Sequence, residues 1–150
     1  MKYELILRII LERPTSGVEF GLQKGRGSAY ETVQKQKANG GNLQFQFNVK
    51  YKQDKNKAIV LSGPFVHGTP NDRFVYIDIG TYAGQINSPW SRRLKIPLSD
   101  ITPEMIDQLL SDPELIIETS VPGTGKDGGP NCATVKPFQG WVLKQKSDFN

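Results

Sequence analysis

A glycine-rich segment near the C-terminus holds residue types that could bind an anion. Residues 121–138 read VPGTGKDGGPNCATVKPF, and four glycines surround Lys126: Gly123, Gly125, Gly128 and Gly129. Glycines allow successive backbone N–H groups to turn toward one point, and such concave amide nests bind anions. The lysine adds a positive charge. The segment therefore predicts an anion-binding loop, and a plain connection between two strands is the alternative.

The same segment does not fit a nucleotide-binding motif. A P-loop needs a glycine ahead of its Gly-Lys pair, a Ser or Thr after the lysine, and a following helix. Here Ser120 stands where the glycine belongs, Asp127 follows the lysine, and Pro130 disfavours a helix. A G-x-G-x-x-G match begins at Gly123 but does not open a helix between two strands. We predict no cofactor.

Cys132 and His67 are the single cysteine and the single histidine of the chain, so a Cys–His nucleophile pair must use both. A reactive thiolate needs a nearby histidine, cation or helix N-terminus, and nothing in the sequence brings these two loops together. A buried structural cysteine and an exposed loop imidazole are the favoured alternatives. Asp72, Asp78 and Asp127 have no spacing that pairs them for acid–base work. We expect binding rather than catalysis, and a Cys/His-dependent hydrolase or transferase is the enzymatic alternative.

Residues 88–98, SPWSRRLKIPL, carry a second group of functional side chains. In a strand, Arg92 lies on one face, and Arg93 and Lys95 lie on the other. Trp90 is two residues before Arg92, so the guanidinium could stack on the indole. Arg and Lys side chains capture carboxylates or phosphates, and Arg93 and Lys95, with Arg73 as a further candidate, are predicted to play such a role.

Acidic residues could neutralise these cations instead. The alternative is a solvated strand face whose cations pair with acids such as Asp100 or Glu118. In the preceding predicted strand, Phe74, Tyr76 and Asp78 share one face. That face either lines a cavity or packs beneath a helix.

Length and composition indicate one domain over residues 1–150. The chain has 37% hydrophobic and 23% charged residues, which is typical of a globular protein. One cysteine cannot form an internal disulfide, and no Cys/His cluster exists in the sequence for a metal. The longest apolar run, residues 5–11, is far shorter than a membrane span. We predict a soluble cytoplasmic protein that does not bind membranes.

The charge distribution is polarised. Residues 96–125 contain six acids and no Lys or Arg, so this block carries −6 within a chain of net charge +4. Such polarity could pair subunits head to tail, which makes a self-assembling or protein-interaction module, including a homo-oligomer, the alternative function. Nucleic acid is not favoured as a partner, because the basic residues are scattered.

Strand-like alternation covers most of the chain and predicts a mainly β fold. Residues 43–51 alternate apolar and polar side chains, as a half-buried antiparallel strand does. Further period-2 runs lie at residues 3–12, 18–23, 74–79, 92–98, 114–121 and 141–144, with a weaker run at 58–66. The first run is partly apolar on both faces, so we expect a strand that is central or is covered on its second face by the helix or a partner subunit. The polar residues 31–41 indicate a loop or one irregular turn. About eight strands suggest an antiparallel sandwich or partly closed barrel.

One helix is predicted over residues 103–111. Thr102 suits the N-cap, and Pro103 suits the first helical position because its missing N–H needs no partner there. Asp112 and Pro113 end the helix, because the residue before a proline avoids the α region. An apolar face that includes Ile106 indicates that the helix plugs or flanks a sheet.

Three phrases together resemble a known family: FVYIDIGTYAGQ, SPWSRRLKIPL and VPGTGKDGGPNCATVKPFQGW. Over essentially its whole length, the chain is similar to a bacterial family of uncharacterised proteins catalogued only as a domain of unknown function. The resemblance implies a small stand-alone bacterial protein. It carries no established activity and no catalytic residues to transfer.

From the residues themselves we predict binding of a small anionic ligand. The predicted site combines the loop from Gly123 to Gly129, including Lys126, with Arg92, Arg93 and Trp90. Backbone amides would hold the anion, the cations would neutralise it, and the indole would stack on a planar portion.

Overall fold

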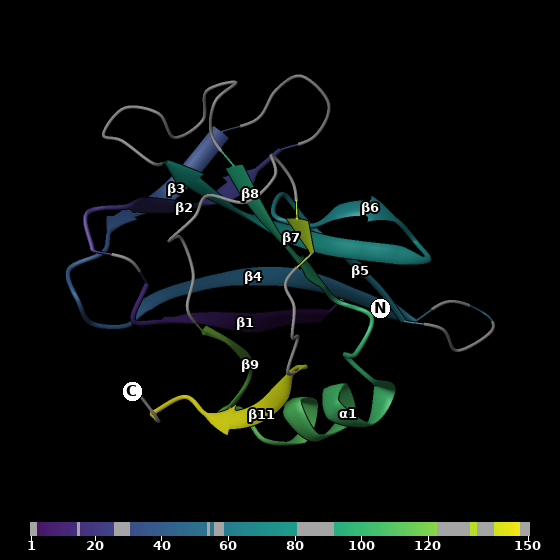
Figure 1. The fold of residues 1–150 in the computed structure, drawn as a ribbon. Coiled ribbons are helices and arrows are strands. Elements are labelled where there is room, and N and C mark those ends of the chain that lie inside the picture. The colour runs from purple at the N-terminus through teal and green to yellow at the C-terminus, as the bar shows by residue number, and fades with distance from the viewer. Residues whose placement is uncertain are drawn as a thin grey trace.

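The computed structural model describes residues 3–14, 16–25, 31–53, 55, 59–80, 92–122, 133–134 and 140–147. Figure 1 shows two layers of strands, with one helix beside the lower layer. The layers are two mostly antiparallel sheets, and within the described ranges they do not close into a barrel. The predicted mainly β sandwich with one helix is confirmed. No helix in the described part of the chain is long and apolar enough to cross a membrane.

The first sheet has the strand order β11-β9-β1-β4-β5. Its strands are β1 (Tyr3–Glu12), β4 (Leu43–Gln53), β5 (Ile59–Ser62), β9 (Leu115–Pro122) and β11 (Val142–Gln145). β1 pairs antiparallel with β4 and parallel with β9. The first strand is therefore central, as its two apolar faces predict.

The second sheet has the strand order β10-β8-β7-β2-β3, and β6 pairs with β7 outside this order. Its strands are β2 (Glu19–Lys24), β3 (Glu31–Lys37), β6 (His67–Thr69), β7 (Asp72–Gly80), β8 (Arg92–Pro97) and β10 (Ala133–Thr134). The described residues thus form more strands than the eight predicted, because β3, β6 and β10 give no clear period-2 signal.

The hydrophobic core lies between the two sheets. The inward positions of β4 are buried, as their alternation predicts: Leu43, Phe45, Phe47, Val49 and Tyr51. The second sheet contributes Val75, Ile77 and Ile79 from β7. Burying a large apolar side chain stabilises the fold by about 1.5–3 kcal/mol. The alternation of apolar and polar residues therefore decides which face of each strand turns toward the core.

Strand β3 contradicts the prediction of a loop over residues 31–41. β3 pairs antiparallel with β2, and the pairing register shifts between Phe20 and Leu22. Near this irregularity, Gln34 adopts a positive φ of 54°. The strand is at the edge of its sheet and most of its side chains are polar, so hydrophobic periodicity cannot reveal it.

Two glutamines of β3 connect the second sheet to the first. The Gln34 side chain donates to the backbone oxygen of Gln46 at 2.8 Å and accepts from its backbone N–H at 3.3 Å. The Gln36 side chain donates to the backbone oxygen of Gln44 at 2.7 Å. These bonds satisfy backbone groups of β4 along one side of the sandwich.

Helix α1 (Pro103–Ser111) has the predicted bounds. The Thr102 hydroxyl accepts from the Met105 N–H at 3.2 Å, and Asp112 forms the C-cap in an extended conformation. Ile106 is fully buried, and the helix contacts β9 and β11. It therefore flanks the first sheet.

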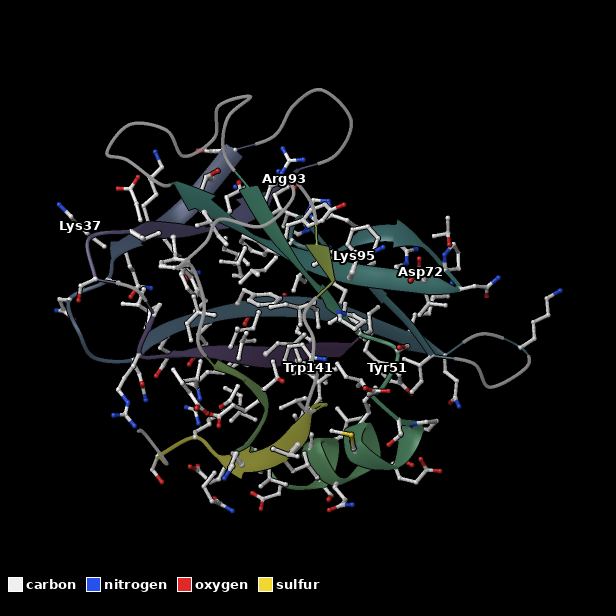
Figure 2. All side chains as sticks on the ribbon, viewed as in Figure 1. Lys37, Tyr51, Asp72, Arg93, Lys95 and Trp141 are labelled. Atoms are coloured by element: carbon white, nitrogen blue, oxygen red, sulfur yellow. The ribbon has the colours of Figure 1, made fainter. Side chains whose placement is uncertain are left out.

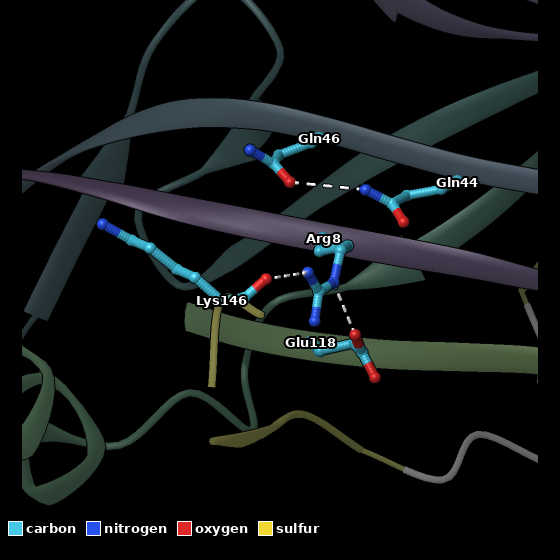
Figure 3. A network of polar contacts seen from close by, with 5 residues as sticks. All are labelled: Arg8, Gln44, Gln46, Glu118 and Lys146. Carbon is cyan, nitrogen blue, oxygen red and sulfur yellow. Dashed lines mark hydrogen bonds and ion pairs between the residues drawn. The ribbon is translucent and has the colours of Figure 1, made fainter. Parts of the chain in front are cut away.

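An ion pair is buried on the outer side of the first sheet, where β1 lies beside β9. The Arg8 Nε atom lies 2.6 Å from the Glu118 carboxylate, and Arg8 Nη1 donates to the backbone oxygen of Lys146 at 3.2 Å (Figure 3). Arg8 and Glu118 are both buried. These contacts tie Lys146, the residue after β11, to β1 across β9. Glu118 therefore has Arg8 as a partner, which differs from the predicted Arg93 or Lys95.

Candidate functional site

The outer face of the second sheet carries a cluster of aromatic and charged side chains. Val75 and Ile77 on β7 face the core, so the alternate residues Phe74, Tyr76 and Asp78 point away from it. The shared face of these three residues is confirmed. The alternative that they pack beneath the helix is wrong, because α1 packs on β9 and β11 of the other sheet.

Strand β8 places two cations on the same face. In the antiparallel pairing, Arg93 lies opposite Asp78 and Lys95 lies opposite Tyr76. Figure 2 shows Arg93 and Lys95 along β8, with Asp72 beside Lys95. We call Phe74, Tyr76, Arg93 and Lys95 the cationic face.

Asp78 is the buried acid beneath this face. It accepts a hydrogen bond from the Thr32 hydroxyl at 2.7 Å and from Arg93 Nε at 3.2 Å, and it is fully buried. Burial raises the pKa of this carboxyl, and the bond from Thr32 and the charge of Arg93 oppose that rise. Gly21 lies opposite Asp78 on the intervening strand β2.

Arg93 is held from three sides. Asp78 contacts its Nε, and the Gln23 amide, oriented with its oxygen toward the guanidinium, accepts from Nε at 3.1 Å and from Nη2 at 3.2 Å. The guanidinium carbon lies 5.6 Å from the centre of the Tyr76 ring. The side chain is nevertheless 32% exposed, so a fixed positive charge faces solvent.

Lys95 is the second cation of this face. Its Nζ lies 4.3 Å from the centre of the Phe74 ring and 3.9 Å from the Asp72 carboxylate. The Phe74 and Tyr76 rings meet edge to face at 4.9 Å. Cations above aromatic rings gain electrostatic attraction, so both cations are held close to an aromatic surface.

His67 belongs to the same cluster, and the expectation of an exposed loop imidazole is wrong. It begins strand β6, is buried, and lies against the rings of Phe74 and Tyr76 at 6.1 and 5.1 Å between centres. Its Nε2 lies 3.4 Å from the backbone oxygen of Gln23. Pairing with β7 buries the ring, and this long-range pairing has no signal in the turn-like local sequence.

Most of the other predicted ligand-binding residues lie outside the described residues: Trp90, Gly123, Gly125, Lys126, Gly128 and Gly129. Cys132 lies outside them as well, and for Arg92 only the backbone, at the start of β8, is described. The described flanks of the glycine-rich segment are Pro122, which pairs with Glu12 in the first sheet, and Ala133, which pairs with Leu94 in the second. The C-terminal flank therefore pairs with β8 at Leu94, between Arg93 and Lys95.

Arg93 and Lys95 do lie beside acids, as the alternative of paired cations expects, but the acids in these contacts differ from the suggested Asp100 and Glu118. Asp78 and Asp72 are the acids beside these cations. Sequence reasoning also missed Gln23 and Thr32 as parts of the cluster. Thr32 lies in the segment predicted to be a loop. For Gln23, the sequence indicates only that its side chain points outward from a predicted strand.

The chain belongs to a family of unknown function, DUF5990. The family's sequence profile matches residues 5–144, which include every strand of both sheets except the first two residues of β1 and the last residue of β11. No curated protein and no solved structure matches the chain.

Membership of DUF5990 assigns no activity to the protein, because the function of the family is unknown. Among the described residues, no three or more His, Cys, Asp or Glu side chains form a group that could hold a metal ion. The described cluster instead offers two partly exposed cations above aromatic rings, with carboxylates beside them. Such an arrangement can bind an anion that also carries a planar group.

Proposed function

We propose that this is a small bacterial cytoplasmic protein that binds a small anionic ligand without catalysis. Arg93 and Lys95 of the cationic face would contact the anion. The observation that carries the proposal is the placement of both cations on one face of β8, each over an aromatic ring. The proposal rests on these charges and not on a nucleophile paired with a base.

The fixed position of the cations supports binding. Asp78 and Gln23 hold the guanidinium of Arg93, and Asp72 lies beside the ammonium of Lys95. Ordering a long side chain on binding costs about 0.5–1.5 kcal/mol, and a side chain that is already held avoids part of that cost. Both side chains keep roughly a third of their surface exposed, at 32% and 28%.

The ring surface suggests the class of ligand. Phe74 and Tyr76 are partly exposed beside the cations, so a ligand with a planar conjugated group gains apolar contact as well as charge neutralisation. Ala133 pairs with Leu94 between the two cations. We therefore keep the preceding glycine-rich residues and Lys126, together with Arg92 and Trp90, as part of the proposed site.

Calorimetric titration with three probes tests this proposal. Benzenesulfonate and phenyl phosphate carry an anion on a ring, and sulfate carries the anion alone. We expect both aromatic probes to bind more tightly than sulfate. Arg93→Ala, Lys95→Ala and Lys126→Ala should each weaken their binding about ten- to a hundredfold, because a hydrogen bond to a charged group contributes about 1.5–3 kcal/mol.

Lys50→Ala is the matched control, because Lys50 is exposed on β4 of the other sheet. This change should leave the affinities unaltered. Equal affinities in the wild type and in all three site variants would overturn the proposal, as would an aromatic probe that binds no better than sulfate.

A self-assembling module is the second candidate, and the acidic surface around α1 favours it. Asp100, Glu104, Asp107 and Glu114 are all exposed around this helix, which flanks the first sheet, whereas the cationic face belongs to the second (Figure 1). Opposite charges on different sides of a molecule can pair copies head to tail. Light scattering should then show larger particles at low salt than at high salt, and a monomer at every salt concentration contradicts this candidate.

A further inference from the structure

A pocket of about 350 Å³ lies at one end of the sandwich, and none of the four cationic-face residues lines it. Ile59 and Leu61 of β5 contribute one wall from the first sheet, and Arg73 of β7 contributes from the second. Leu98 and Ile101, in the connection from β8 to α1, line it as well. The pocket therefore continues the space between the sheets at the point where the hydrophobic core ends.

Arg73 gives this pocket its chemical character. Along β7, the inward row runs from Ile79 through Ile77 and Val75 to position 73, so the guanidinium occupies the last inward position of a core-facing row. Its Nη1 donates to the backbone oxygen of Gly68 at 3.2 Å, which holds the side chain at the pocket wall. Among the described residues that line the pocket, Arg73 is the charged one.

The start of helix α1 adds to this positive field. Pro103, the first residue of the helix, lies on the pocket wall. The N-terminal end of a helix carries a partial positive charge, which favours an anion nearby, although Glu104 in the first turn offsets part of it. One wall region is thus cationic and the remaining walls are mainly apolar.

From this combination we propose that the pocket binds a small monocarboxylate whose apolar body enters between the sheets while its carboxylate meets Arg73. Small-molecule sites have volumes of about 300–1,000 Å³ and are mostly apolar with a few placed polar groups. A volume of about 350 Å³ is near the lower end of that range. The ligand is therefore a short aliphatic or single-ring acid. This site is distinct from the cationic face, because Arg73 and Arg93 lie on opposite faces of the second sheet.

Titration with octanoate and with octanol tests the inference, because the two probes share an apolar chain and differ in the charged group. We expect octanoate to bind at least about tenfold more tightly than octanol. Arg73→Gln should remove this preference by weakening octanoate alone. Arg13→Gln makes the same change at an exposed arginine and is the matched control.

Ser99→Trp provides an independent variant at an exposed turn position that lines the pocket. The indole should obstruct the pocket and weaken both probes, while urea unfolding confirms that the variant folds. Equal binding of octanoate and octanol, no octanoate binding, or an unchanged preference in Arg73→Gln would each overturn the inference. Competition with benzenesulfonate separates the two sites: octanoate in this pocket should not displace a probe bound at the cationic face.

Discussion

Replacing Asp78 with asparagine tests whether burial or the attraction of Arg93 controls how the stability of the fold depends on pH. The carboxyl is fully buried, accepts from Thr32 and Arg93, and also feels the charge of the nearby His67. Asparagine keeps the shape and one acceptor oxygen, but it cannot ionise. The variant therefore removes the titration of this group while disturbing its packing little.

Burial is the main cause of the raised pKa of Asp78. The raised pKa fixes whether the free energy of unfolding increases or decreases with pH. The folded protein keeps the proton at pH values where the unfolded carboxyl, with its ordinary pKa of 3.8, has already lost it. The stabilisation that comes from the protonated Asp78 carboxyl is complete below the pKa of this group in the unfolded chain. It is lost as pH rises through the pKa of the group in the folded protein. One proton limits the slope to about 1.4 kcal/mol per pH unit.

Urea unfolding of the wild type and of Asp78→Asn, from about pH 4 to pH 8, measures this difference. Near the acidic end we expect the two free energies of unfolding to agree within about 1 kcal/mol, because a protonated carboxyl and an amide form hydrogen bonds of similar strength. As pH rises, the wild type should lose stability relative to the variant.

Two controls make the result specific. Asp72→Asn removes an exposed carboxylate from the same strand and should change stability by no more than about 0.5 kcal/mol. Repeating the comparison in a His67→Gln background removes the charge that the neighbouring imidazole contributes at Asp78. If the wild type instead gains stability over Asp78→Asn as pH rises, the attraction of Arg93 outweighs burial and our reasoning is wrong.

Three further changes test local features of the fold by urea unfolding. Gln34→Ala should lower the free energy of unfolding by about 1–2 kcal/mol, because it removes both hydrogen bonds to the Gln46 backbone. Gln34→Gly should lower it by about 1 kcal/mol less, because glycine accepts the positive φ at this position. Equal losses in the two variants would refute the argument from backbone strain. Gly68→Ala should lower the free energy of unfolding by about 2–4 kcal/mol, because φ is +94° and an added Cβ would overlap the Asp72 carbonyl oxygen. A loss below about 1 kcal/mol would contradict this expectation. Thr102→Ala should cost about 1 kcal/mol by removing the cap of α1, whereas Thr102→Ser should cost much less.

Part of the candidate site was predictable from local patterns. Alternation along residues 74–79 places Phe74, Tyr76 and Asp78 on one face, and the same rule places Arg93 and Lys95 together. Both groupings agree with the registers found. The partners of these residues were not predictable, because Asp78 meets Arg93 through the pairing of two strands and meets Thr32 across a third. A local pattern gives the face of a strand but not its neighbour.

Elements with local causes follow directly from the amino-acid sequence. Helix α1 has its predicted bounds because Thr102, Pro103 and Pro113 act within a few residues of their own positions. The strands with clear alternation form because burying every second side chain is favourable wherever they pack. Tertiary structure alone decided the rest: strand β3 exists because β2 and β4 satisfy its polar groups, and His67 is buried because β6 pairs with β7. Those pairings join residues far apart in the chain, and the sequence carries no local record of them.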